Sequence, residues 1–181
     1  TLPLLVPIVC EDLGFDKKIS STARRFLDRK DLVSLESIEP SGKSKILSTL
    51  LKSVGPVDEA LHSLASAPLS NRAKLVLDHA ALVLSGVRAS LPKLVLTLDP
   101  SEYRGFEYHT GLGFTIFAKN VRGELGRGGR YSIPNGENAT GFSVYLDSVM
   151  RAITLHHPMK RILVSLKTSH ASLRSLRANG W

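Results

Sequence analysis

Apolar residues recur with helical spacing through the first half of the chain. In residues 16–38 the spacing is kept by Ile19, Ala23, Phe26 and Leu27. Positions three, four and seven apart lie on one face of a helix, so this segment predicts a core-facing helix followed by a second one. The same reasoning predicts helices over residues 46–54 and from residue 57 onward, separated by the breaker Gly55-Pro56.

The last helix of this half is expected over residues 70–84. It would be capped at Ser70 or Asn71 and would end before Gly86. From about residue 93 the pattern changes to alternation of apolar and polar positions. Alternation is typical of half-buried strands, and it appears in residues 94–98 and 114–118.

The remaining segments complete an α+β fold. Residues 123–129 are rich in glycine and predict a turn, and residues 140–145 predict a further strand. A helix is expected over residues 146–155. Residues 162–166 and 169–179 then predict one terminal strand and one terminal helix.

Composition narrows the function classes. The chain has 24 lysines and arginines and 16 acidic residues, which gives a net charge of +8, but the basic residues are spread along the chain. A basic RNA-binding module, whose affinity would fall steeply with salt, therefore ranks last. The lone Cys10 excludes an internal disulfide and a cysteine-rich zinc site, and we expect it in the core. No apolar run approaches the ~20 residues of a membrane span, which predicts a soluble, cytoplasmic protein.

Three clusters of glycine and aromatic residues carry the candidate chemistry. They are Tyr-Arg-Gly-Phe-Glu-Tyr-His-Thr-Gly at 103–111, Gly-Arg-Gly-Gly-Arg-Tyr at 126–131 and Gly-Phe-Ser-Val-Tyr-Leu-Asp at 141–147. A ligand with a carboxylate and a ring suits such groups. Arg104 offers a guanidinium fork, Phe106 a flat surface, and His109 and Tyr131 hydrogen-bonding groups for ring nitrogens. The alternative interpretation of the first cluster is a polar hairpin rim.

The order and spacing of the clusters resemble the histidine-recognition motifs and third signature motif of histidyl-tRNA synthetases, which are class II enzymes. Their Arg-Gly-Leu-Asp-Tyr-Tyr is matched by residues 104–109, and their Gly-Gly-Arg-Tyr-Asp by residues 128–132, with Ser132 in place of the aspartate. The resemblance implies part of a class II synthetase-like antiparallel sheet with helices, preceded by a helical segment. It also implies a histidine site formed by Arg104, Phe106, Tyr108, His109, Gly128, Gly129 and Tyr131.

The third cluster departs from the family at the residues that serve ATP. The family has a glycine where this chain has Tyr145, and a phosphate-binding arginine where it has Ser148. A serine hydroxyl cannot replace a charge-assisted phosphate contact. The resemblance therefore implies a site that binds histidine without activating it, with no catalytic residue, metal ligand or cofactor.

Among synthetase-like proteins that lost aminoacylation, the chain is most similar to the regulatory subunits of ATP phosphoribosyltransferase in histidine biosynthesis. This implies a hetero-oligomer with the catalytic subunit, with histidine as effector and without membrane or nucleic acid as partner. Residues 1–92 then correspond to an insertion-like helical segment, 93–157 to the synthetase-like sheet, and 158–181 to a short C-terminal strand-helix unit. The alternative is a fragment of an active histidyl-tRNA synthetase.

Overall fold

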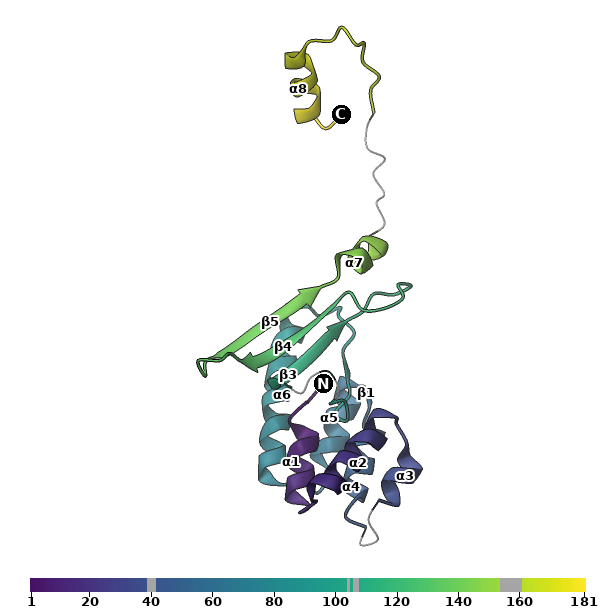
Figure 1. The fold of residues 1–181 in the computed structure, drawn as a ribbon, viewed down its shortest axis with the longest axis vertical. Coiled ribbons are helices and arrows are strands. Elements are labelled where there is room, and N and C mark those ends of the chain that lie inside the picture. The colour runs from purple at the N-terminus through teal and green to yellow at the C-terminus, as the bar shows by residue number, and fades with distance from the viewer. Residues whose placement is uncertain (39–41, 104, 106–107, 154–160) are drawn as a thin grey trace.

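The computed structural model describes residues 1–38, 42–103, 105, 108–153 and 161–181. Helices α1 to α6 lie together, and a three-stranded sheet lies against one end of them (Figure 1). The elements follow in the order α1 (Leu5–Asp12), α2 (Lys17–Asp28), α3 (Leu32–Glu36), α4 (Lys45–Lys52), β1 (Gly55–Pro56), α5 (Val57–Ala65), α6 (Asn71–Ser90), β2 (Thr97–Leu98), β3 (His109–Ile116), β4 (Gly126–Ser132), β5 (Asn138–Val144), α7 (Leu146–Ala152) and α8 (His170–Ala178).

The helical half contains the hydrophobic core. Helix α2 buries Ala23 and Leu27 on the face that the sequence predicted, and Asp16 caps it by accepting a hydrogen bond from the Ile19 amide at 2.8 Å. Cys10 is buried in this core, and burial raises the pKa of its thiol. The core consists of Leu2, Leu5, Val6, Val9, Cys10, Ala23, Leu27, Leu35, Leu47, Leu50, Val57, Ala60, Leu64, Ala67, Leu69, Ala73, Leu77, Ala80 and Leu98.

Two helices differ from the sequence prediction. No element was assigned before residue 16, yet α1 forms there with Pro7 in its first turn. Proline is tolerated at that place because the first amides of a helix have no partner within the helix. Helix α6 begins at the predicted cap Ser70 but continues through Gly86 to Ser90, because one glycine costs less than the remaining turn contributes.

The sheet is antiparallel in the order β3-β4-β5, and a separate two-residue ladder joins β1 to β2. The predicted turn at residues 123–129 is wrong in its second half, since β4 begins at Gly126. The predicted strand at 94–98 shrinks to Thr97–Leu98 because its partner is Gly55–Pro56, and proline has no amide to extend the ladder. At the outer edge of β3, Thr1 exchanges both backbone hydrogen bonds with Gly113, at 2.8 and 3.2 Å.

In the described residues after α7, the chain forms one helix, α8, and no strand. The strand predicted at residues 162–166 is wrong, whereas α8 forms as expected with Ser169 as its cap. Helix α8 buries none of its residues. Its apolar side chains therefore contribute little hydrophobic stabilisation. The division of the chain into the three predicted domains stays a prediction.

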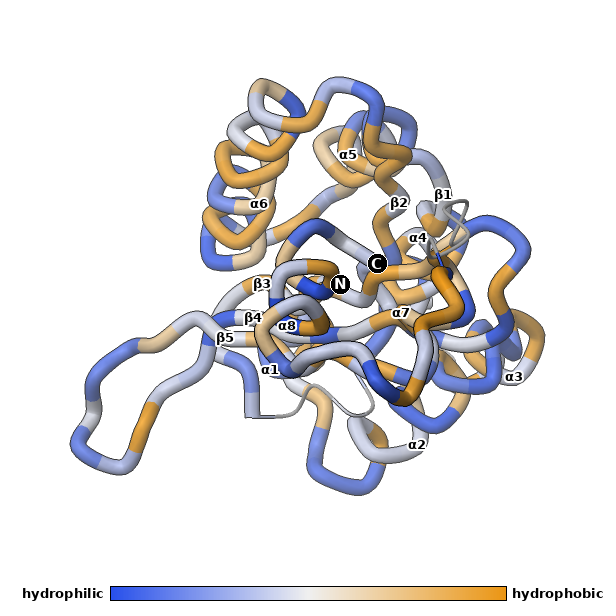
Figure 2. Tube along the Cα trace, turned by 90° about the horizontal axis from the view of Figure 1, so that it is seen from above, coloured by the Kyte–Doolittle hydropathy of each residue, from blue (hydrophilic) through white to orange (hydrophobic). Residues whose placement is uncertain are grey.

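Apolar residues are not confined to the core-facing side of the helices. Along α6, hydrophobic and hydrophilic turns alternate (Figure 2), and Leu82 is 72% exposed while Leu77 is 7% exposed. None of the helices in the described ranges has the length and apolar character needed to cross a membrane.

Helix α6 allows a matched test of the core. We expect Leu77→Ala to lower the free energy of unfolding by about 2 to 4 kcal/mol, because it leaves a cavity against the core. Leu82→Ala on the same helix should change it by about 0.5 kcal/mol or less. Urea unfolding followed by circular dichroism measures both. Equal losses would show that the core does not include α6.

Candidate functional site

The register of the strands divides the candidate residues between two faces of the sheet. The face that we call the His109 face carries His109, Gly113, Thr115, Arg127, Gly129, Tyr131, Ala139, Gly141 and Ser143. The opposite face, here the Phe114 face, carries Phe114, Ile116, Gly126, Gly128, Arg130, Thr140, Phe142 and Val144. The two phenylalanine rings meet at 6.5 Å, which agrees with this division.

A row of glycines crosses the His109 face. Gly113, Gly129 and Gly141 are neighbours on the three strands, so this row has no side chains. The His109 imidazole lies in the space above Gly129: a Cβ added there would stand 2.6 Å from its Nε2 and from the Leu112 carbonyl oxygen. His109 reaches this place because the register shifts between His109 and Gly113, which bends β3.

The aromatic rings gather around this imidazole. The ring of Tyr108 lies 4.1 Å from that of His109 and 6.2 Å from that of Tyr131, the latter edge-on at 63°. The Tyr131 hydroxyl leans over Gly141, where an added Cβ would be 3.2 Å away. His109 is only 3% exposed and Tyr108 is 63% exposed. The buried imidazole thus orients a cluster whose outer ring, that of Tyr108, remains accessible to a flat polar ligand.

The structure brings together Tyr108, His109, Gly129 and Tyr131. Gly128 lies on the other face, where its added Cβ would collide with Phe142, so it lets β4 approach β5 and does not line the aromatic cluster. Arg104 and Phe106 lie outside the described residues.

Arg127 is a residue that the sequence analysis missed. It was not among the predicted site residues, but it lies on the His109 face, and one of its terminal nitrogens would be 3.6 Å from a Cβ at Gly105. The alternation of Gly126, Arg127 and Gly128 along a strand could have indicated this, had β4 been recognised as a strand.

The segment leading to the cluster is fixed by a polar network. The Asp99 carboxylate accepts hydrogen bonds from Lys30 at 2.6 Å and from the Ser101 amide and hydroxyl at 3.0 and 2.7 Å. Burial acts to raise the pKa of Asp99, but the hydrogen bonds from Lys30 and Ser101 outweigh it and hold that pKa below its ordinary value. Burial, reinforced by Asp99, raises the pKa of the neighbouring Glu102.

The third cluster ends in α7. Ser148 is buried there and accepts a hydrogen bond from Arg151 at 2.9 Å, while Arg151 forms an ion pair with Asp147 at 3.0 Å. Among the described residues, a guanidinium therefore does lie beside Ser148, one helical turn further along. Its charge is already compensated by the Asp147 carboxylate, whose pKa it lowers through a hydrogen bond.

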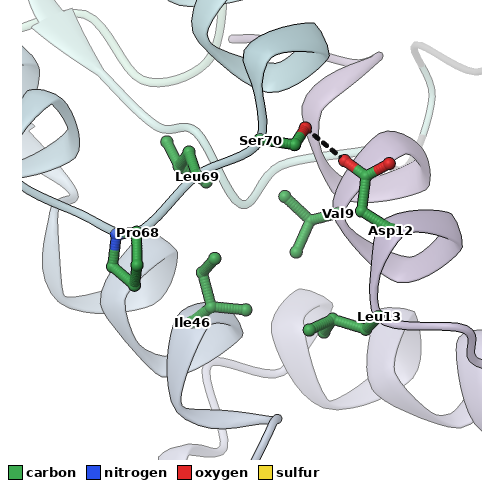
Figure 3. Close-up of a pocket in the computed structure, with 7 residues that line it drawn as sticks. All are labelled: Val9, Asp12, Leu13, Ile46, Pro68, Leu69 and Ser70. Atoms are coloured by element: carbon green, nitrogen blue, oxygen red, sulfur yellow. Dashed lines mark hydrogen bonds between the residues drawn. The ribbon is translucent and has the colours of Figure 1, made fainter.

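A pocket of about 250 Å³ lies in the helical half, away from the clusters (Figure 3). Its lining is mainly apolar, and its one carboxylate, Asp12, already accepts hydrogen bonds from Ser70 and, at 3.5 Å, from Arg72. It therefore offers no free charge to a ligand. Within the described ranges no three histidine, cysteine or acidic side chains converge as a metal site would require.

Comparisons with known proteins agree with the motifs. The family model described as histidyl-tRNA synthetase matches residues 1–149. Two relatives, both named ATP phosphoribosyltransferase regulatory subunit, are 41% identical over 99% of this chain in Paramagnetospirillum magneticum and 43% identical over 100% in Rhodospirillum centenum. The chain spans 47% of the length of each.

Solved structures share the fold. An ATP phosphoribosyltransferase regulatory subunit/histidyl-tRNA synthetase from Bacillus halodurans matches 86% of this chain and 43% of its own, with a TM-score of 0.71 and 20% identity. A chain of the ATP phosphoribosyltransferase complex from Thermotoga maritima matches 80% of this chain and 51% of its own, with a TM-score of 0.65 and 19% identity. The predicted α+β, synthetase-like fold is confirmed.

The close contact at Gly129 predicts the effect of one methyl group. Gly129→Ala should lower the free energy of unfolding by about 1 to 3 kcal/mol, because the Leu112 backbone and the His109 ring must both shift. Gly86→Ala in α6 is the control: its Cβ meets nothing within 4 Å, and it should stabilise the chain by about 0.5 to 1 kcal/mol. Urea denaturation distinguishes the two, and a neutral Gly129→Ala would contradict the contact.

The lowered pKa of Asp99 predicts the pH dependence of Asp99→Asn. A carboxyl with a lower pKa in the folded state stabilises above its unfolded pKa and loses this contribution as pH falls through its folded pKa. The substitution should therefore cost about 1 to 2 kcal/mol at pH 7 and progressively less below about pH 4. Unfolding free energies of both proteins over this pH range provide the measurement. A difference that stays constant would exclude a charged Asp99 as the stabilising species.

Proposed function

The chain belongs to the histidyl-tRNA synthetase family, and from that premise we propose that it acts as a noncatalytic regulatory subunit of ATP phosphoribosyltransferase in histidine biosynthesis. It would bind histidine, the end product of the pathway, and transmit its level to a catalytic subunit in a cytoplasmic hetero-oligomer. The names of the relatives that are 41% and 43% identical support this assignment.

The effector site of this proposal is the aromatic cluster on the His109 face. Histidine would be held by Arg104, Phe106, Tyr108, His109 and Tyr131, on the outer side of the His109 ring that covers Gly129. The arginine would meet its carboxylate, and the Tyr131 hydroxyl would bond an imidazole nitrogen. Arg127, on the same face, offers a second cation for the carboxylate.

The absence of catalysis rests on one observation, which is that Ser148 stands where the family has its phosphate-binding arginine. The hydroxyl of Ser148 is engaged by Arg151, and Asp147 compensates the charge of that arginine. Stabilisation of charge that develops on a phosphate requires a cation directed at it, and Arg151 is directed at a carboxylate.

Regulation requires that histidine bind one state of the assembly more tightly than another. Such coupling commonly amounts to about 1 to 3 kcal/mol, and by linkage the catalytic subunit must alter the affinity for histidine by the same factor.

The alternative is part of an active histidyl-tRNA synthetase, and the guanidinium of Arg151 beside Ser148 is the observation that favours it. If Arg151 left Asp147 to bind ATP, the enzyme would activate histidine. Histidine-dependent exchange of pyrophosphate into ATP by the full-length protein decides between the two. We expect no exchange, together with co-purification of the transferase catalytic subunit. Robust exchange that disappears in Arg151→Met would defeat the regulatory assignment.

The hydroxyl of Tyr131 provides the test of the effector site. Tyr131→Phe in the full-length protein should weaken histidine binding by about fivefold, corresponding to one neutral hydrogen bond of about 1 kcal/mol. Arg130→Gln, the adjacent residue of β4 on the Phe114 face, is the control and should leave the affinity unchanged. Isothermal titration calorimetry measures both. Equal effects of the two substitutions would place the histidine site elsewhere.

A further inference from the structure

Helix α2 and the turn that follows it hold the segment that leads into the histidine motif. Lys30, just beyond α2, donates to Asp99 Oδ2 at 2.6 Å and to Ser101 Oγ at 2.8 Å. One turn and a half earlier, the Arg24 guanidinium lies 4.6 Å from the centre of the Tyr103 ring. Residues 99–103 are thus bound at both ends by cations from one part of the helical half.

The network is internally satisfied, and it extends from the buried Ser101 to the surface, where the Lys30 side chain is 44% exposed. Ser101 is fully buried, and its hydroxyl donates to Asp99 while it accepts from Lys30. The side chain of Asp99 is 19% exposed. A buried polar network of this kind specifies one geometry, because moving any member leaves the others without a partner.

The backbone of Lys30 adopts a conformation that few residues with a Cβ adopt. Its φ is 55°, and the turn is closed by the amides of Lys30 and Asp31, which donate to Leu27 and Phe26 at 3.0 and 2.9 Å. These two hydrogen bonds form a Schellman motif, in which the residue after the helix cap adopts a positive φ. Here the turn directs the ammonium group of Lys30 to a segment 69 residues further along the chain.

The tethered segment is continuous with the effector site. Before it, β2 pairs with β1, and Leu98 is buried in the core. The segment ends at Tyr103, which Arg24 contacts, and the strand that follows in the sequence is β3, which begins with the buried His109. The contacts of Lys30 and Arg24 therefore fix residues 99–103, which directly precede the histidine motif in the sequence.

We propose that Lys30, with Asp99, is a positioning residue that sets the geometry of the histidine site from the helical half of the molecule. The inference rests on the proposed function, in that histidine is taken as the ligand. Since coupling is reciprocal, occupancy of the site also restrains the turn after α2, which makes this turn the route by which the helical half responds to histidine.

The experiment uses the full-length protein with its catalytic subunit and three variants. Lys30→Met removes the ammonium group but keeps a Cβ and an unbranched chain, so the backbone at residue 30 is unchanged. Lys30→Arg restores a cation. Arg88→Met is the control for lost surface ion pairs, because Arg88 binds Asp58 at 2.6 and 2.7 Å between α6 and α5, away from the motif.

Two measurements are made on each variant, histidine affinity by calorimetry and protection of backbone amides by hydrogen exchange. We expect Lys30→Met to weaken histidine binding by about tenfold and to reduce protection at Ser101 and in β3, with Lys30→Arg close to the parent protein and Arg88→Met without either effect. Thermal unfolding of Lys30→Met and Arg88→Met separates loss of positioning from general destabilisation.

The outcomes separate the two proposals. If the parent protein binds no histidine, the proposed function fails, and the positioning role is then decided by amide protection alone. If Lys30→Met and Arg88→Met are indistinguishable in both affinity and protection, the positioning role is overturned while the proposed function stands. Equal losses in Lys30→Met and Lys30→Arg would also overturn it, since a retained cation would then have no effect.

Discussion

The close approach of the His109 ring to the backbone of Gly129 is the contact on which the candidate site depends. It requires both the absence of a side chain at Gly129 and the shift of register in β3, because the His109 ring reaches this place only when both are present. The ring of Tyr108 lies beside this buried imidazole, and the ring of Tyr131 lies edge-on to that of Tyr108. The backbone of the sheet, through Gly129 and the register shift in β3, therefore determines the geometry of the aromatic cluster.

The helical half and the sheet of the molecule are joined at several places. The helical half buries its apolar side chains in a core formed by α1 to α6. The sheet, by contrast, leaves the phenylalanine side chains of its Phe114 face exposed. The sheet is attached to the helical half through β2, through the network of Lys30 and Asp99, through the backbone hydrogen bonds of Thr1 with Gly113, and through Leu112, which packs against the core. In the sequence, Asp99 precedes the histidine motif and Leu112 follows it.

The sequence was most informative where one physical rule decided the outcome. Helical spacing identified the buried face of α2, and Ser70 identified the start of α6. It failed where tertiary structure outweighed local preference. The glycines of β4 predicted a turn, but they lie in a strand and allow the neighbouring strands to approach closely. Helix α1, which contains Pro7, was not predicted. The contact of Lys30 with Asp99 joins residues 69 apart and follows from no local pattern.

A site of this kind can keep its ligand after losing its reaction, because binding and catalysis draw on different residues. His109 and Tyr131, two of the candidate residues for a ring, lie on β3 and β4, and the backbone geometry of the sheet positions them. The position at which the family has its phosphate-binding arginine lies on α7, a separate element, where Arg151 donates hydrogen bonds to Asp147 and Ser148. Ser148 in place of that arginine removes a cation without altering the glycine row of the sheet. The separation of these elements is what lets one fold serve either as a synthetase or as a sensor of the amino acid that the synthetase would use.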